Sequence, residues 1–260
     1  MGRGEMADKE EREAVIFRYS GRFGHFLRAE ASVSALSYPV PPRTALLGMI
    51  GAVLGLEKDA PQVELADALI SVAGPIPRTH WHRVKLRKDP PTPLPRSVKK
   101  GAKGSSAPEK ATLIRQEWLF NPSYTVTACL PVGYHDELVF RLREGHWHYS
   151  PCLGLSEMPA RLEYVEEGAA CPLPSESEVH CTSVARGNSA TVNGRGTLEA
   201  SANGEPLAIL PLRMPREVTV DRVFTHADYI VERSGLPMPL RADDAYEISS
   251  ATGTTVVIFL

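Results

Sequence analysis

The residues with the clearest chemistry lie between positions 18 and 56, where basic and aromatic side chains lead into a proline-rich loop and then an apolar helix. The loop, residues 37–44, has the sequence SYPVPPRT. Prolines restrict its backbone, and the first turn of the following helix offers unpaired N–H groups that suit a phosphate. Arg43 and Thr44 stand in that predicted first turn, where Arg43 adds a full positive charge. This arrangement suits a single-stranded RNA.

Two kinds of side chain could complete such a site. Cations would position the phosphates, and exposed aromatic rings would stack on unpaired bases, at roughly 1–3 kcal/mol per base. For each aromatic residue the alternative is a place in the hydrophobic core. For Arg43 an explanation without a bound anion is weaker, because a lone cation at a helix N-terminus is mildly unfavourable when no anion is present. The candidate cations are Arg22, Arg28, Arg43, Lys85, Arg87 and Arg115, and the candidate rings are Phe26, Tyr38 and Trp81.

Positive charge is concentrated in one segment. The formal net charge of the chain is −2, yet residues 78–110 contain ten basic and two acidic residues, a local charge of +8. A basic projection on an acidic body can follow a phosphate backbone while the rest of the protein avoids unspecific binding. On composition alone the alternative is a solvated loop without a ligand. The candidate RNA contacts that this segment adds are Lys88, Lys99 and Lys100, beside Lys85 and Arg87.

Hydrophobic periodicity and turn residues predict the elements that would position these side chains. We expect strands at 14–19, 76–86, 111–120 and 124–130, and helices at 44–56, 61–72 and 135–143. Gly48, Gly51 and Gly55 are expected on one face of the first helix, where they would permit close packing on a sheet. Strands and helices in this order favour a ferredoxin-like domain, the split βαβ pattern that RNA-recognition motifs also use.

The predicted organisation is an α+β fold with an N-terminal domain and a smaller lobe. Residues 88–110, rich in Pro, Gly, Ser and Lys, cannot build a core, so we interpret them as the tip of a long β-hairpin. From residue 161 onward the predicted strands are short, and no helix is expected. The expected parts are a charged tail at 1–13, a ferredoxin-like RNA-binding domain at 14–154 with an extended basic thumb at about 80–120, and a β-rich C-terminal lobe at 155–260.

Other chemistries have little basis in the sequence. The four cysteines form no CxxC pair, and no Walker loop, GxSxG elbow or HExxH helix is present. The pairs His80-x-His82 and His146-x-His148 could hold a metal, but no cysteine pair or carboxylate motif supports them. We therefore expect no metal and no cofactor. The charged N-terminus and the lack of a long apolar run predict a cytoplasmic protein without a membrane segment.

Three segments carry a resemblance to a known family. They are GRFGHFLRAEASVSALSYPVPPRTALLGMIGAVLGL, RQEWLFNPSYTVTACL and YSPCLGLSEMPARLEYVE, spread over most of residues 14–167. In these segments the chain resembles the family-five CRISPR-associated proteins, members of the repeat-associated RNA-binding superfamily (RAMP) found in type I interference (Cascade) complexes. After residue 168 the similarity is only one of general character.

The resemblance implies a fold and a set of partners. Family members have a ferredoxin-like domain with a hairpin thumb and a variable β-rich lobe. They hold the repeat-derived 5′ handle of a CRISPR RNA (crRNA), cap a filament of family-seven backbone subunits and lie beside a large family-eight subunit, so target DNA near the PAM end is a further possible partner. By this resemblance residues 37–44 correspond to the loop near the handle, and residues 83–115 to the thumb.

A second function remains open within the same family. One branch cleaves the CRISPR repeat as a metal-independent endoribonuclease that uses tyrosine, lysine and histidine side chains. This chain carries His25, Tyr38, His80, His82 and Lys85, and a histidine can serve as general acid or base. In the processing branch the tyrosine lies toward the end of the first helix, where this sequence has Ala52-Val53-Leu54. We therefore expect a non-catalytic RNA-binding subunit in an antiviral ribonucleoprotein.

Overall fold

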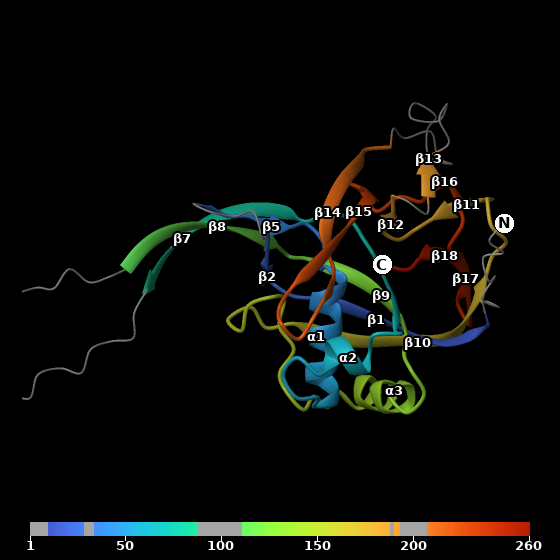
Figure 1. Cartoon of the computed structure of the whole chain (residues 1–260), viewed down its shortest axis with the longest axis horizontal. Coiled ribbons are helices and arrows are strands. Elements are labelled where there is room, and N and C mark those ends of the chain that lie inside the picture. Colours follow the sequence, from blue (N-terminus) through green and yellow to red (C-terminus); the bar gives the residue numbers. More distant parts are fainter. Residues whose placement is uncertain (1–9, 29–33, 88–110, 188–189, 193–206) are drawn as a thin grey trace, which may run out of the picture.

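The central sheet is built around β1 (Arg12–Ser20), which has a neighbouring strand on each side. The computed structural model describes residues 10–28, 34–87, 111–187, 190–192 and 207–260 and shows an α+β fold made mostly of strands (Figure 1). Phe17 and Tyr19 of β1 face one hydrophobic cluster, and Ala14 and Ile16 face another. Both faces of the strand are covered, which explains why nearly every residue in its middle is apolar.

Four strands, β1 included, and three helices form the block around β1. The strands lie in the order β10-β1-β9-β6, each antiparallel to its neighbour. In the chain, α1 follows β1 and α3 follows β9. The helices lie together on one side of this part of the sheet (Figure 1). The bounds are β6 Leu69–Ala73, β9 Ser123–Cys129, β10 Arg161–Pro172, α1 Arg43–Leu54, α2 Pro61–Glu64 and α3 His135–Glu144.

The sheet continues beyond β10 through five more strands, in the order β17, β18, β11, β16 and β13. The boundary expected at residue 154 falls just before β10, yet β10 pairs along the whole of β1. Residues on both sides of that boundary therefore share one sheet. Likewise Arg12 and Glu13, expected in the tail, belong to β1. The added strands are β11 Ser177–Cys181, β13 Ala190–Val192, β16 Met238–Ala242, β17 Ala245–Ser250 and β18 Gly253–Ile258.

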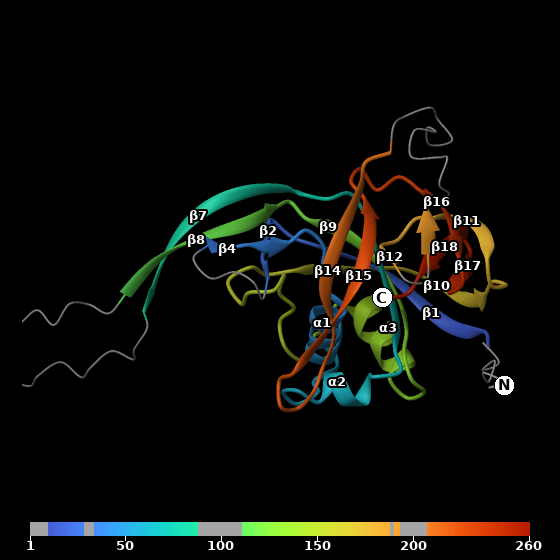
Figure 2. The same ribbon diagram turned by 45° about the horizontal axis from the view of Figure 1, so that its top comes forward.

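A separate hairpin packs against α1. It consists of β14 (Ile209–Val218) and β15 (Phe224–Glu232), with the short β12 (Ala185–Arg186) paired to β15. Met214, Tyr229 and Val231 bury their side chains in the same core cluster as α1 and the central strands. Figure 2 shows the hairpin crossing α1 toward the side of α2.

The predicted thumb arms pair with each other. β7 (Arg78–Arg87) and β8 (Ala111–Phe120) form an antiparallel ladder from Arg78↔Phe120 to Arg87↔Ala111. They extend away from the body of the molecule (Figures 1 and 2). Residues 88–110, and with them Lys88, Lys99 and Lys100, lie outside the described residues. Short strands brace the root of the thumb: β2 (Phe23–Gly24) and β4 (Ser34–Ala35) pair with β8, and β3 (Phe26–Leu27) pairs with β5 (Ser37–Tyr38).

The helix expected at 61–72 is wrong beyond its first turn. The helix α2 ends at Glu64, and β6 begins at Leu69 and pairs with β9. The apolar and β-branched side chains of Ile70 and Val72 are fully buried in the sheet, so tertiary packing overrides the local helical pattern. Of the described helices, none combines the length and the apolarity needed to cross a bilayer.

The glycines of α1 do not pack on the sheet as a group, which corrects a second expectation. Gly48 faces open space, and a side chain at Gly51 would collide with the ring of Pro61. Gly55 ends the helix with φ +83°, the left-handed conformation that glycine adopts without strain. Gly51 therefore serves close packing against α2, and Gly55 also lies close against the side chain of His148.

Candidate nucleic-acid interface

The thumb has two chemically different faces. Directly opposite residues of an antiparallel pair share a face, and successive residues alternate. One face, here called the basic face, presents Trp81, Arg83, Lys85 and Arg115, all of them exposed. Arg87 belongs to this face by register, although the structure describes only its backbone. The face thus brings together Trp81, Lys85 and Arg115, three of the residues that the sequence predicted.

An arginine and an aromatic ring are in contact on the basic face. The guanidinium carbon of Arg115 lies 5.1 Å from the centre of the Trp81 ring, and Trp81 is 43% exposed. Arg83 lies directly opposite Arg115 in the ladder, so two like charges are held side by side. Like charges at this position destabilise a free hairpin. A phosphate would relieve the repulsion, and a base could stack on the ring beside it.

The opposite face of the thumb is more apolar. Val84, Ile114 and Trp118 lie on it, and the rings of His82 and Trp118 stack with centroids 4.2 Å apart. The side chain of Gln116 is buried there and accepts a hydrogen bond from the Trp118 indole. Charge on the described part of the thumb therefore gathers mainly on one side.

The loop at 37–44 is fastened to the root of the thumb. The backbone N–H of Ser37 donates to a carboxylate oxygen of Glu117 at 3.1 Å, and the Phe26 N–H donates to the Ser37 hydroxyl at 3.0 Å. The His25 ring donates from Nδ1 to the Glu117 carbonyl oxygen at 2.8 Å, since that carbonyl can only accept. Burial lowers the pKa of His25, with a smaller opposing effect from Glu117, so its ring is neutral near pH 7.

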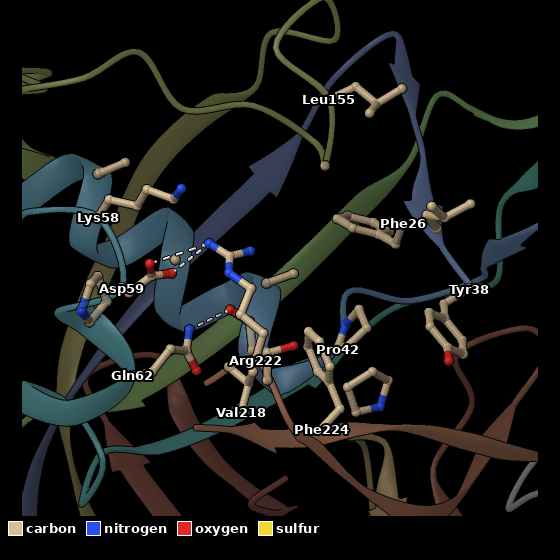
Figure 3. Close-up of a pocket in the computed structure, with 18 of the residues that line it drawn as sticks. Phe26, Tyr38, Pro42, Lys58, Asp59, Gln62, Leu155, Val218, Arg222 and Phe224 are labelled. Carbon is tan, nitrogen blue, oxygen red and sulfur yellow. Dashed lines mark hydrogen bonds and ion pairs between the residues drawn. The ribbon is translucent and has the colours of Figure 1, made fainter. Parts of the chain in front are cut away.

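A groove of about 870 Å³ adjoins this root. It runs between the loop, α1 and the tip of the β14–β15 hairpin, and Thr44 and Gly48 of α1 are among its lining residues. Figure 3 shows Pro42 of the loop and Phe224 of the hairpin in its wall. Arg222 at the hairpin tip pairs with Asp59 of the loop after α1, with an N–O distance of 2.9 Å. The groove also includes edges of Phe26 and Tyr38, so it joins three of the predicted residues.

Phe26 and Tyr38 are core residues rather than open stacking platforms. Their exposed fractions are 4% and 2%, and both belong to the main hydrophobic cluster. The expectation that these two rings stack on bases does not hold in this conformation, because a ring must be exposed to stack on a base. Arg28 covers the Tyr38 ring at 5.4 Å and donates from Nε to the Ser37 carbonyl. Arg22 remains at the surface, over the ring of Phe23 at 5.5 Å.

Arg43 also differs from its expected position. It begins α1 as predicted, but it is only 6% exposed, and its Nη2 donates to the carbonyl oxygens of Ala66 at 2.6 Å and Ala68 at 3.0 Å. The guanidinium thus ties α1 to the segment before β6 and is not presented at the surface. Burial, followed by the charge of Arg216, lowers its pKa. The sequence does not predict these two contacts, because their acceptors are backbone carbonyls, which no particular residue type identifies.

The residues considered for RNA cleavage do not converge. Lys85 lies on the basic face, whereas His80 and His82 lie on the opposite face of the thumb. His25 and Tyr38 are buried at its root. Among the described residues, no group of three or more His, Cys, Asp or Glu side chains is arranged to hold a metal ion.

Sequence reasoning missed two parts of this surface. Arg83 was counted in the basic segment but not chosen as a contact, although strand alternation from Lys85 would have placed it on the same face. The β14–β15 hairpin was not expected near α1. The local sequence does not predict where this hairpin lies, because its position depends on packing between residues far apart in the chain.

Comparisons with known proteins show what this chain is similar to. The model of a family described as CRISPR-associated protein (Cas_Cas5) matches residues 14–204. A CRISPR protein from Archaeoglobus fulgidus has a similar structure, with TM-score 0.50 and 11% identity, covering 95% of this chain and 99% of the other. A chain of a CRISPR RNA-guided surveillance complex gives TM-score 0.46 at 17% identity, covering 87% and 91% of the two chains. No curated protein matches the sequence.

Proposed function

The chain belongs to the CRISPR-associated Cas_Cas5 family, and from this premise we propose that it is a non-catalytic RNA-binding subunit of a CRISPR effector complex that works in the cytoplasm. One observation carries the proposal: the basic face of the thumb presents Arg83, Lys85 and Arg115 around an exposed Trp81. Cations for phosphates and a ring for a base are the two elements that a single-stranded RNA needs.

Within that role, we propose that the thumb and the adjoining groove hold the 5′ handle of the crRNA in a type I complex. The handle would lie along the basic face and reach the loop at residues 37–44. The order β10-β1-β9-β6 with α1 and α3 in the connections supports a ferredoxin-like block as the body of this RNA-binding unit. The partners in the proposal are family-seven backbone subunits, a family-eight large subunit and target DNA near the PAM end.

The non-catalytic part of the proposal is supported by the separation of the candidate acid–base groups. A general acid and a general base must reach the same scissile phosphate within hydrogen-bond distance. Lys85 and the pair His80 and His82 lie on opposite faces of the thumb. Incubation of the purified chain with repeat RNA, followed by gel analysis, should leave the RNA intact; a specific cut would contradict this part.

Charge reversal on the basic face tests RNA binding. We expect the double variant Arg83→Glu/Arg115→Glu to bind a repeat-derived RNA at least tenfold more weakly at moderate salt. The slope of the logarithm of the binding constant against the logarithm of the salt concentration should also become shallower. The expected change in slope is about 0.7 for each phosphate of a single strand that the variant no longer neutralises. Affinities measured over a series of salt concentrations give both quantities.

The matched control lies on the other face of the same hairpin. Arg78 is exposed and pairs with Phe120 on the more apolar face, so Arg78→Glu makes the same kind of charge change away from the basic face. We expect its affinity to stay close to that of the wild type. Equal losses of affinity in both variants would show a nonspecific charge effect, and an unchanged affinity in the double variant would show that RNA binds elsewhere.

Handle binding has its own test. The chain is purified from cells that carry a CRISPR array, and the ends of the attached RNA are sequenced. A uniform repeat-derived 5′ end supports the handle proposal. Heterogeneous 5′ ends would contradict it while leaving general RNA binding in place.

A further inference from the structure

Two exposed aromatic rings line the groove beside the root of the thumb. Phe224 of the β14–β15 hairpin is 47% exposed, and Tyr149 of the segment before β10 is 51% exposed. Neither ring belongs to a hydrophobic cluster of the described residues, whereas Phe26 and Tyr38 do. An aromatic ring that is open to a groove can stack on a flat group that enters it.

The floor of the groove is a face of α1 that carries only small side chains. Thr44, Gly48 and Ala52 are spaced four residues apart, so they lie on the same side of the helix, and all three line the groove. The large apolar side chains of α1 are buried in the core instead. A side chain at Gly48 would meet no atom within 4 Å outside the backbone of its own helix, so the groove is open above this floor.

Both rings belong to segments that are fastened beside α1. The backbone N–H of Tyr149 donates to the carbonyl oxygen of Ala52 at 3.0 Å. On the hairpin side, Arg222 lies two residues before Phe224 and pairs with Asp59 of the loop after α1 (Figure 3). Rings on segments that are already held in place lose little conformational freedom on binding, which favours their use as stacking platforms.

The formal charges in the wall of the groove cancel. The charged residues that line it are Lys58, Arg222, Glu57 and Asp59. A wall with two cations and two carboxylates has no net attraction for a phosphate, in contrast to the basic face of the thumb. The groove therefore suits the uncharged, flat part of a nucleotide better than its phosphate.

We propose that the groove binds unpaired bases of a single-stranded RNA, with Phe224 and Tyr149 as the stacking rings. The inference rests on the proposed function, because the groove would give the same RNA a second contact. The phosphates would follow Arg83, Lys85 and Arg115 on the basic face, and bases beyond the thumb would turn into the groove. Its volume of about 870 Å³ is within the roughly 300–1,000 Å³ usual for sites that hold small organic groups.

The test uses the full chain and two strands of equal length. One strand is a repeat-derived RNA, and the other is an abasic strand that keeps the ribose–phosphate backbone. Phe224→Ala and Tyr149→Ala should each weaken binding of the repeat-derived RNA about tenfold, as expected for the loss of one stacked base. Neither should change the affinity for the abasic strand, which has nothing to stack. Fluorescence anisotropy at low salt measures both affinities, since phosphate contacts alone then hold the abasic strand.

Gly48→Leu tests the groove without the removal of a ring. The added side chain would occupy the space above α1, so this variant should also bind the repeat-derived RNA at least about tenfold more weakly, the loss expected when a base no longer stacks. Leucine favours a helix more than glycine does, so the melting temperature should not fall. A loss of RNA affinity in a protein that is at least as stable as the wild type cannot be a loss of folding.

Phe140→Ala is the matched control. Phe140 of α3 is 55% exposed and is not one of the residues that line the groove, so this variant should bind both strands as the wild type does. The inference is overturned if the three groove variants bind the repeat-derived RNA as Phe140→Ala does, which would leave the groove to a protein neighbour. It is also overturned if the two ring variants lose as much affinity for the abasic strand, because the rings would then act on the fold and not on bases.

These outcomes differ from a failure of the proposed function. If Arg83→Glu/Arg115→Glu loses RNA affinity while the groove variants bind normally, only the groove inference is overturned. If the groove variants lose affinity while that double variant binds normally, the groove site is supported and the role of the basic face is contradicted. A wild-type chain that binds neither strand would overturn both proposals.

Discussion

The backbone N–H of Ser37 and the carboxylate of Glu117 are hydrogen-bonded at 3.1 Å, although 80 positions separate them in the sequence. Glu117 belongs to the second strand of the thumb, and Ser37 begins the loop that leads into α1. The carbonyl of Glu117 also accepts from His25. Glu117 of the thumb therefore fixes the positions of two segments of the body, those that contain His25 and Ser37, relative to the basic face.

Removal of this carboxylate should loosen the loop. We expect Glu117→Ala to lower the free energy of unfolding by about 1.5 kcal/mol, since the variant has no charged acceptor for the backbone donor. The Ser37 amide should exchange with solvent faster, as hydrogen exchange by mass spectrometry would reveal. Glu163→Ala is the control, because within the described residues its carboxylate pairs with the exposed Arg161 side chain, a contact that should contribute under about 1 kcal/mol. Unchanged exchange at Ser37 would contradict the role given to Glu117.

Trp81 should matter for binding and little for folding. We expect Trp81→Ala to weaken RNA binding by about 1–3 kcal/mol, the usual contribution of one stacked base. Phe120 is the control, since it is 44% exposed but lies on the opposite face of the thumb. Phe120→Ala should keep its RNA affinity, as measured by fluorescence anisotropy, while thermal unfolding confirms the fold of both variants. A similar loss of affinity in the two variants would argue against a stacking role for Trp81.

Arg43 should be a determinant of stability. Arg43→Met leaves the carbonyls of Ala66 and Ala68 without their donor and should lower the free energy of unfolding by about 2–3 kcal/mol. Arg43→Lys keeps a charge but lacks the planar fork, so it should recover only part of the stability. Urea denaturation of the three proteins measures the difference. Wild-type stability in Arg43→Met would show that the two carbonyl contacts contribute nothing.

His25 should make folding sensitive to acid. Its pKa in the folded protein lies below the ordinary value of 6.5, chiefly because the ring is buried. The unfolded chain therefore takes up the proton first as pH falls, and the stability that is present above pH 6.5 is lost below it. His25→Asn keeps a donor for the Glu117 carbonyl but cannot titrate, so it should show a smaller loss of unfolding free energy between about pH 7.5 and about pH 5.5.

The control for this titration is an exposed histidine. His180→Gln removes an exposed imidazole from the surface of β11, away from the contact between His25 and Glu117, and should preserve the acid sensitivity of the wild type. Parallel urea titrations at the two pH values compare the three proteins. An equal loss of unfolding free energy in His25→Asn and the wild type would place the acid-sensitive group elsewhere.

Elements with strong local signals were predictable. β1, β9, α1 and α3 lie within two residues of their expected bounds, because alternation or helical periodicity there agrees with the tertiary environment. The pairing of the thumb arms was also predictable, since two strand-like segments flank a stretch that cannot build a core. The same alternation would have assigned Arg83 to the basic face.

Features that depend on distant partners were not predictable. Residues 65–72 have a helical pattern, but β9 offers a strand partner, and burial of Ile70 and Val72 decides the outcome. A basic residue at a helix start favours anion binding when read locally, yet backbone carbonyls more than twenty residues away hold Arg43 inside the protein.

The place of β1 between β9 and β10 has a consequence for biosynthesis. The strand leaves the ribosome well before its two neighbours, and the second of them is not made until residues 161–172 have been translated. Such long-range pairing is slow to form, and an apolar strand with an unpaired edge can recruit other nascent chains. We therefore expect a chaperone that shields β1 to improve the yield of folded protein until β10 has been translated.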